Sequence, residues 1–328
     1  MSGTKNQRNN LSNKTDLNNN NINNKIQKLK PKPSFDFEFG LINKNLNITN
    51  DSSVSKNIFQ LTSKKADLLL IRIVNASSIE NINIKINSAG MIEGSSRNAK
   101  DGLTFFGIID KYDKNNKDIK DNNVDYILDL NNDNDENNNS IIGRHFHIRF
   151  DIKTMKYYIK DLGCGYGTFR KIVRKEKLKD SNFLNIGNSY LICSFGASEH
   201  NLEHPEGEVE DEDKILNIKI FGDNGEEPYY FNPKVVKKIY IGRDNCCNIF
   251  VNDPLLWRIN CTIKYKEDGG WAIYDGKKDD DENQSQESTN GTWIYISDET
   301  QIYDGFVFKN NNNAFECNIV HQKRDWIF

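Results

Sequence analysis

Cysteine, histidine and long apolar runs are scarce in this sequence, and each shortage excludes a class of protein. The six cysteines include no Cys-X-X-Cys pair and there are only five histidines, so no metal site is expected. No apolar run approaches membrane length and no signal peptide opens the chain, which predicts an intracellular protein, nuclear or cytoplasmic, with free thiols and no membrane partner. The formal net charge of −3 argues against a general nucleic-acid binder.

Groupings typical of catalysis are also missing. No Ser-His-Asp, Cys-His or paired-carboxylate set stands out, so we predict no catalytic residue, no cofactor and no enzyme activity. One string, Ile159–Gly167, looks like the glycine-rich first motif of S-adenosylmethionine-dependent methyltransferases. Such enzymes need strands and helices that alternate around a parallel sheet, whereas the flanks here offer short strands and Asn-rich loops. A methyltransferase is therefore kept only as a further alternative.

Asparagine is heavily over-used, and its distribution divides the chain. Polar tracts cannot bury apolar surface, so residues 1–34 are predicted to be a disordered tail and residues 35–65 are left unassigned. The strongly acidic residues 199–213 are interpreted as a linker. Two stretches remain, which we call the first segment (residues 66–198) and the second segment (residues 214–323).

Short alternating apolar runs in both segments predict β-strands. The candidate strands are Leu68–Val74, Ile215–Phe221, Lys238–Ile241, Cys261–Lys266, Gly270–Asp275, Thr292–Ile296, Phe306–Lys309 and Ala314–His321. Many short strands separated by turn residues favour an all-β fold with two antiparallel β-sandwiches in tandem. A single amphipathic pattern, Thr168–Leu178, predicts a helix.

The second segment can be laid over the first. The matching blocks are His145–Phe150 with Asn260–Tyr265, Tyr158–Asp161 with Ala272–Asp275, and Gly167–Phe169 with Gly291–Trp293. Differences in length fall in the turns, as expected for a duplicated sandwich.

The candidate binding residues lie in loops of the second segment. Arg243 follows a strand and Gly242, so its guanidinium should project from the end of a sheet, where it can hold a phosphate through two parallel hydrogen bonds. Thr289 and Asn290 lie in a later polar turn, where a hydroxyl, an amide and backbone N–H groups can complete the cradle. Gly291 is expected to serve the backbone of that turn.

The order of these motifs resembles the forkhead-associated (FHA) domain, from Ile215 to His321. They run Ile-Gly-Arg, Asn-Ile, Leu-Trp-Arg and then the turn that ends in Gly291 and Thr292. The resemblance implies that Arg243 and Thr289 contact the phosphate of a phosphothreonine. It also implies that Asn290 bonds the peptide backbone and that Arg258 adds a further contact.

Two residues depart from the family pattern. Trp257 stands where the family has a phosphate-contacting serine, and Asn260 stands where it has a structural histidine. The indole removes one expected hydroxyl from the pocket and is expected to occlude it in part.

A more diverged resemblance covers Asp67 to Ser198. Ile142-Gly143-Arg144 is a weaker copy of the Ile-Gly-Arg motif, and Arg97 is the alternative arginine candidate. Gly165 and Tyr166 replace the threonine and the asparagine of the turn. The matches that remain are structural: His145, Gly167 and Thr168.

The sequence is thus identified as a tandem FHA protein, with a composition that resembles FHA proteins of Asn-rich protists such as ciliates. The resemblance implies an adaptor that binds the phosphothreonine segment of another protein, with the second segment as reader and the first as a diverged scaffold. A structural interaction module that does not bind phosphate is the alternative.

Overall fold

The computed structural model describes residues 66–74, 83–97, 99–109, 124–128, 141–196, 215–221, 228–266, 269–278, 285–311 and 313–321. The predictions for residues 1–34, 35–65 and 199–213 lie outside these ranges. The described residues form strands and no helix, so the all-β prediction is confirmed. No helix in this part of the chain is therefore long and apolar enough to cross a membrane.

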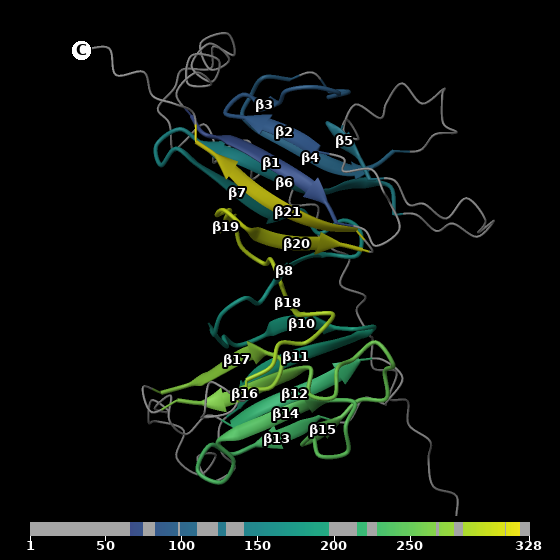
Figure 1. Cartoon of the computed structure of the whole chain (residues 1–328), viewed down its shortest axis with the longest axis vertical. Coiled ribbons are helices and arrows are strands. Elements are labelled where there is room, and N and C mark those ends of the chain that lie inside the picture. Colours follow the sequence, from purple (N-terminus) through teal and green to yellow (C-terminus); the bar gives the residue numbers. More distant parts are fainter. Residues whose placement is uncertain are drawn as a thin grey trace, which may run out of the picture. The chain divides into compact units, whose positions relative to one another are not determined.

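The first sandwich consists of two layers of strands (Figure 1). The two layers pack around one apolar cluster. In spatial order, one layer holds β3 (Gly90–Met91), β2 (Asn83–Asn87), β1 (Leu68–Ile73), β21 (Asn313–Val320), β20 (Phe306–Asn310) and β8 (Thr168–Lys171). The other holds β5 (Tyr126–Ile127), β4 (Leu103–Ile108), β6 (Gly143–Asp151), β7 (Lys156–Asp161) and β19 (Thr300–Gln301). The first sandwich therefore contains strands from both segments.

The second sandwich has the same arrangement around its own cluster. One layer holds β13 (Tyr229–Phe231), β12 (Ile215–Phe221), β11 (Ser189–Gly196), β10 (Asn182–Ile186) and β18 (Thr292–Tyr295). The other holds β15 (Ile249–Phe250), β14 (Lys238–Gly242), β16 (Cys261–Tyr265), β17 (Trp271–Asp275) and β9 (Glu176–Lys177). The helix predicted over Thr168–Leu178 is wrong, because β8 and β9 lie there and each is paired into a sheet.

The two segments exchange their last strands. Strands β9, β10 and β11 of the first segment complete the second sandwich, where β11 pairs with β12 and β10 with β18. Strands β19, β20 and β21 of the second segment complete the first sandwich, where β21 pairs with β1 and β20 with β8. In Figure 1 the yellow β21 accordingly lies beside the purple-blue β1, and β20 lies on the other side of β21. Each sandwich is therefore built from both segments.

The chain crosses between the sandwiches at β8 and β18. These strands pair antiparallel, with Ile294 opposite Arg170, and the ladder continues at both ends. The N–H of Ile172 donates to the carbonyl oxygen of Thr292, and the N–H of Ile296 donates to that of Thr168, both at 2.9 Å. One eleven-stranded sheet thus runs through both sandwiches.

Lys309 of β20 contacts the neighbouring strands β10 and β18 at this crossing. Its ammonium donates to Oδ1 of Asn185 on β10 and lies 4.8 Å from the ring centroid of Trp293 on β18. Burial lowers the pKa of Lys309 to about 8. The contact joins residues of both segments on one face of the shared sheet.

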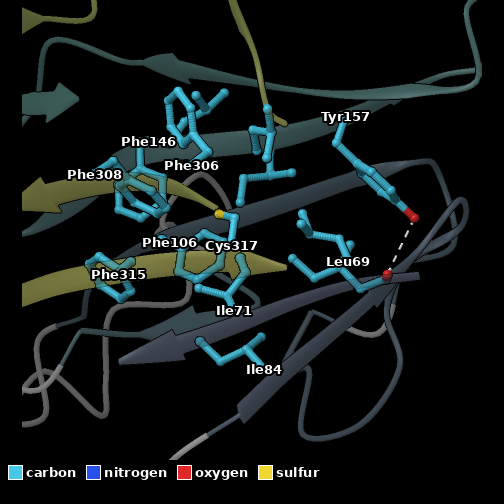
Figure 2. Packing of buried hydrophobic residues seen from close by; sticks show 14 of the residues in the cluster. Leu69, Ile71, Ile84, Phe106, Phe146, Tyr157, Phe306, Phe308, Phe315 and Cys317 are labelled. Atoms are coloured by element: carbon cyan, nitrogen blue, oxygen red, sulfur yellow. Dashed lines mark hydrogen bonds between the residues drawn. The ribbon is translucent and has the colours of Figure 1, made fainter. Parts of the chain in front are cut away.

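Side-chain size explains why the hairpin β20–β21 covers the core of the first sandwich and the hairpin β10–β11 covers that of the second. Phe308 and Phe315 of the exchanged hairpin stack at 4.8 Å, and Phe146 of the first segment meets Phe308 edge-on at 5.3 Å (Figure 2). The corresponding pair in the second sandwich is Leu184 and Leu191, both fully buried in a cluster rich in isoleucine and leucine. Because overpacking a filled core destabilises it, the aromatic hairpin fits the first core better.

Polar pairing reinforces this choice. Asn310 of β20 is buried, lies 3.0 Å from Nδ1 of His145, and donates to the carbonyl oxygen of Gly167 and to Oγ1 of Thr168. The corresponding residue on β10 is Ile186, opposite Thr292 and fully buried among apolar side chains. If the hairpins changed places, Asn310 would lose its partner in a buried site, which is costly.

Candidate phosphopeptide site

The loop that carries Arg243 is fixed by its backbone. Gly242 ends β14 so close to the carbonyl of Arg258 that a Cβ there would collide with it. The N–H of Arg243 donates to the carbonyl oxygen of Trp257 at 3.3 Å, and that of Asp244 to Arg258 at 3.1 Å. The Arg243 side chain is exposed, and no described residue forms a hydrogen bond or ion pair with its guanidinium.

The turn that carries Thr289 and Asn290 is held from below. Buried Ser288 donates to Asp275 at 2.7 Å and accepts the N–H of Gly291 at 2.9 Å, where φ is 77°. Buried Thr292 donates to the same carboxylate at 2.7 Å. This framework leaves the side chain of Thr289 exposed at the top of the turn.

The loop formed by residues 252–258 joins these two elements. The carbonyl oxygen of Leu255 accepts a hydrogen bond from Nδ2 of Asn290 at 2.6 Å, while Trp257 and Arg258 bind the Arg243 loop as described above. Arg258 is exposed and Trp257 is 37% exposed. Hydrogen bonds therefore link the loops of all five residues proposed for binding: Arg243, Trp257, Arg258, Thr289 and Asn290.

Asn260 of the second sandwich forms structural hydrogen bonds at the position where the FHA pattern has a histidine. Its Oδ1 accepts the N–H of Trp257 at 3.2 Å, and its Nδ2 donates to the carbonyl oxygen of Gly291 and to Oγ1 of Thr292 at 3.4 Å. In the first sandwich the same task is shared by His145 and Asn310. His145 is thus a buried structural residue with both ring nitrogens at hydrogen-bonding distance from oxygens.

Among the described residues, Asp244 is an acidic group that borders the arginines. The carboxylate of Asp244 accepts the N–H of Cys246 at 3.0 Å. Hydrogen bonds from Cys246 and, to a smaller extent, the charge of Arg258 lower the pKa of Asp244. A bound phosphate would meet this negative charge beside Arg258.

In the described part of the first sandwich, other residues occupy the corresponding positions. Gly107 of β4 is the equivalent of Gly242, because it pairs with β5 as Gly242 pairs with β15. Like Gly242, it lies too close to a facing carbonyl group to carry a Cβ. The next residue, Ile108, therefore occupies the position of Arg243. The motif Ile142-Gly143-Arg144 is not the equivalent of Ile-Gly-Arg, because Gly143 and Arg144 start β6 and not the strand before it. Tyr166 of the turn is exposed.

Arg97 is engaged within the first sandwich. Its Nε donates to Asp125 at 3.0 Å, and its two terminal nitrogens donate to Asp101 at 2.7 and 3.0 Å, with a further bond to the carbonyl oxygen of Leu103. These carboxylates raise the pKa of Arg97 against the opposing effect of burial. The arginine candidate of the first segment is thus tied to two acidic side chains.

The glycine-rich string has a structural role. It connects β7 in one layer of the first sandwich to β8 in the other layer, and not a strand to a helix beside a parallel sheet. Gly165 packs against the His145 ring so closely that a Cβ would collide with it. The methyltransferase alternative is therefore dropped. No cluster of metal-ligating side chains is found in the described ranges.

The sequence did not reveal the residues whose hydrogen bonds hold the Thr289 turn and the 252–258 loop. Asp275 holds the Thr289 turn, and Asp253 accepts the N–H of Asn188 from the other segment at 2.7 Å. Asp275 could have been suspected, because it ends a strand before the polar turn. No sequence signal points to Asn188, because its contact depends on the exchange.

A comparison with curated protein sequences gave no match. The sequence model of the FHA domain matches residues 239–309, which run from β14 to β20 and include Arg243, Arg258 and the Thr289 turn. An FHA domain is therefore found at residues 239–309 of this chain. FHA domains are in general interaction modules that bind phosphothreonine.

Proposed function

We propose that the second sandwich reads phosphothreonine peptides and that the protein is an adaptor for a phosphorylated partner. The observation that carries the proposal is the exposed guanidinium of Arg243, which is bonded to no described residue and lies on a loop linked by hydrogen bonds to those of Arg258 and Thr289. A phosphate has three acceptor oxygens and nearly two negative charges, which suit this set of donors.

Each candidate residue has a distinct role in this proposal. Arg243 and Thr289 bind the phosphate, and Arg258 adds a second positive charge. Asn290 bonds the peptide backbone through its carbonyl oxygen, because its amide nitrogen already donates to Leu255. Trp257 borders the pocket. Gly242, Gly291 and Thr292 keep the loops in place.

The first sandwich is proposed to be a scaffold that does not bind phosphate. Ile108 has taken the arginine position and Gly165 and Tyr166 the turn positions, while Arg97 is held by Asp101 and Asp125. The domain limits 66–198 and 214–323 remain a proposal for the extent of the two segments along the chain. The alternative without any phosphate reading is favoured by one observation, the bulky indole of Trp257 beside the pocket.

The proposal is tested by screening the full chain against a degenerate phosphothreonine-peptide library. Calorimetry then compares the best sequence in its phosphothreonine, phosphoserine and unmodified forms. We expect an affinity on the order of micromolar, about −8 kcal/mol, for the phosphothreonine form only. Equal binding of the unmodified peptide would favour the alternative.

Replacing Trp257 with serine should strengthen phosphothreonine binding. The substitution removes a bulky ring beside the pocket and supplies a hydroxyl, which is worth about 1 kcal/mol if it forms one ordinary hydrogen bond. Because Trp257 is 37% exposed, the thermal stability of the chain should change little. Titration of Trp257→Ser and wild-type protein with the same peptide measures the effect. Weaker binding with an intact fold would instead identify the ring as a peptide contact.

A further inference from the structure

The 252–258 loop is the element through which the proposed binding residues are held together. Its carbonyl groups at Trp257 and Arg258 accept hydrogen bonds from the Arg243 loop, and that of Leu255 accepts one from Asn290. A shift of this loop would therefore move Trp257 and Arg258 directly and loosen the contacts to Arg243 and Asn290.

The other side of this loop rests on the turn between β10 and β11. The N–H of Asn188 donates to Oδ2 of Asp253 at 2.7 Å, and Oδ1 of Asp253 accepts the N–H of Leu255 at 2.9 Å. Gly187 lies so close to the Asp253 carboxylate and to the buried Leu256 side chain that any Cβ would collide with the carboxylate. The turn and the loop therefore fit together only while residue 187 has no side chain.

This supporting turn belongs to the first segment and reaches the site through the strand exchange. We propose that Gly187 and Asn188 are positioning residues for the phosphothreonine site of the second sandwich, so that the first segment supplies a working part of the reader. This inference rests on the proposed function. It assigns to the first segment a role in binding that its own loops cannot perform.

The test uses Gly187→Asn in the full chain. Gly187 has φ of 51°, and the corresponding turn of the first sandwich places Asn311 at φ of 53°, so the backbone accepts asparagine there. The new side chain must displace Asp253. We expect the affinity for the best phosphothreonine peptide of the library to fall by about ten-fold, because displaced recognition groups lose their bonding geometry.

The matched control is Gly305→Asn. Gly305 has φ of 80°, and a Cβ at this position would meet no atom within 4 Å. It has the same kind of backbone but no contact with the 252–258 loop. Its affinity for the peptide should match that of the wild type, which separates the effect of displacement from that of the substitution type.

A spectroscopic signal distinguishes positioning from general destabilisation. In protein labelled with fluorotryptophan, the ¹⁹F resonance of Trp257, assigned through Trp257→Phe, should shift in Gly187→Asn without any peptide, and stay in place in Gly305→Asn. The resonance of the buried Trp271 should stay in place in both. Gly187→Ala should give a smaller shift and a smaller loss of affinity, since its side chain intrudes less.

The two proposals can fail separately. If the wild-type chain binds no phosphothreonine peptide, the proposed function fails, while the Trp257 resonance still decides whether Gly187 positions the loop. An unchanged resonance and an unchanged affinity in Gly187→Asn would overturn the positioning proposal. If Gly187→Asn does not fold, the same two readouts on Gly187→Ala decide it.

Discussion

Replacing Arg243 with alanine in the full chain should weaken phosphothreonine binding by roughly ten- to a hundred-fold. A hydrogen bond to a charged group contributes about 1.5–3 kcal/mol, and each 1.4 kcal/mol is about a factor of ten in affinity. The Arg243 side chain is exposed and bonded to no described residue, so the fold should not change. Titration calorimetry with the best library peptide measures the loss.

Two further variants sharpen this prediction. Arg243→Lys keeps the charge but loses the paired donors of the guanidinium, so its affinity should lie between those of wild type and Arg243→Ala. Arg174, exposed between β8 and β9 and outside the site, provides the matched control, because Arg174→Ala changes the net charge equally. If Arg243→Ala and Arg174→Ala bind alike, Arg243 is not the phosphate ligand.

The isolated fragment 214–328 should be much less stable than the second sandwich is in the full chain. Without the first segment it lacks β10 and β11 and must cover its core with its own hairpin. That hairpin would place Phe308 and Phe315 where Leu184 and Leu191 pack, and would bury Asn310 away from His145. Overpacking and an unpaired buried amide together cost on the order of 2–6 kcal/mol.

Thermal unfolding and peptide titration of the fragment check this expectation. Since 1 kcal/mol corresponds to about 4–8 °C for a domain of this size, we expect its melting temperature to be lower by roughly 10–50 °C. Substituting Asn310→Ile, Phe308→Leu and Phe315→Leu within the fragment should recover much of the loss, because these residues then match the hairpin it replaces. A fragment as stable as the full chain would contradict the account of hairpin choice.

The strands could be predicted from the sequence because alternation of apolar residues is a local signal. Ile215–Phe221 was predicted with the limits that β12 has, and Lys238–Ile241 is one residue shorter than β14. The helix at Thr168–Leu178 failed because pairing of β8 with β18 and β20 outweighs an apolar pattern that two short strands can also give. Local patterns thus defined the elements but not their partners.

The exchange could not be predicted in this way. Both hairpins have the alternation that suits either sandwich, and what distinguishes them is the fit of Phe308 with Phe146 and of Asn310 with His145. These partners lie more than a hundred residues apart, so their match appears only once the cores are assembled. The loops around Arg243 and Thr289 could be found from motif order, whereas the support from Gly187 and Asn188 could not, because it crosses between segments.

Chain connectivity favours one half of the strand exchange and opposes the other half. In the exchanged arrangement β11 and β12 are neighbours, and Gly196 pairs with Ile215 across a connection of 18 residues, 197–214. Closing this short loop costs less entropy than bringing β11 back to β1. For β21 the loop entropy opposes the exchange, because its partner β1 lies at the far end of the described chain. In this pair Leu68 lies opposite Val320. Core fit then decides between the two arrangements.

Cleavage of the chain between the two segments tests this arrangement most directly. A specific protease site placed within residues 199–213 would be cut in the folded protein, and the product examined by gel filtration and by titration with a phosphothreonine peptide. Because each sandwich contains strands of both segments, we expect the two pieces to stay together as one particle that binds the peptide as the uncut chain does, and to separate only in denaturant. Two pieces that separate under native conditions, with the piece from the second segment binding the peptide alone at full affinity, would contradict the account.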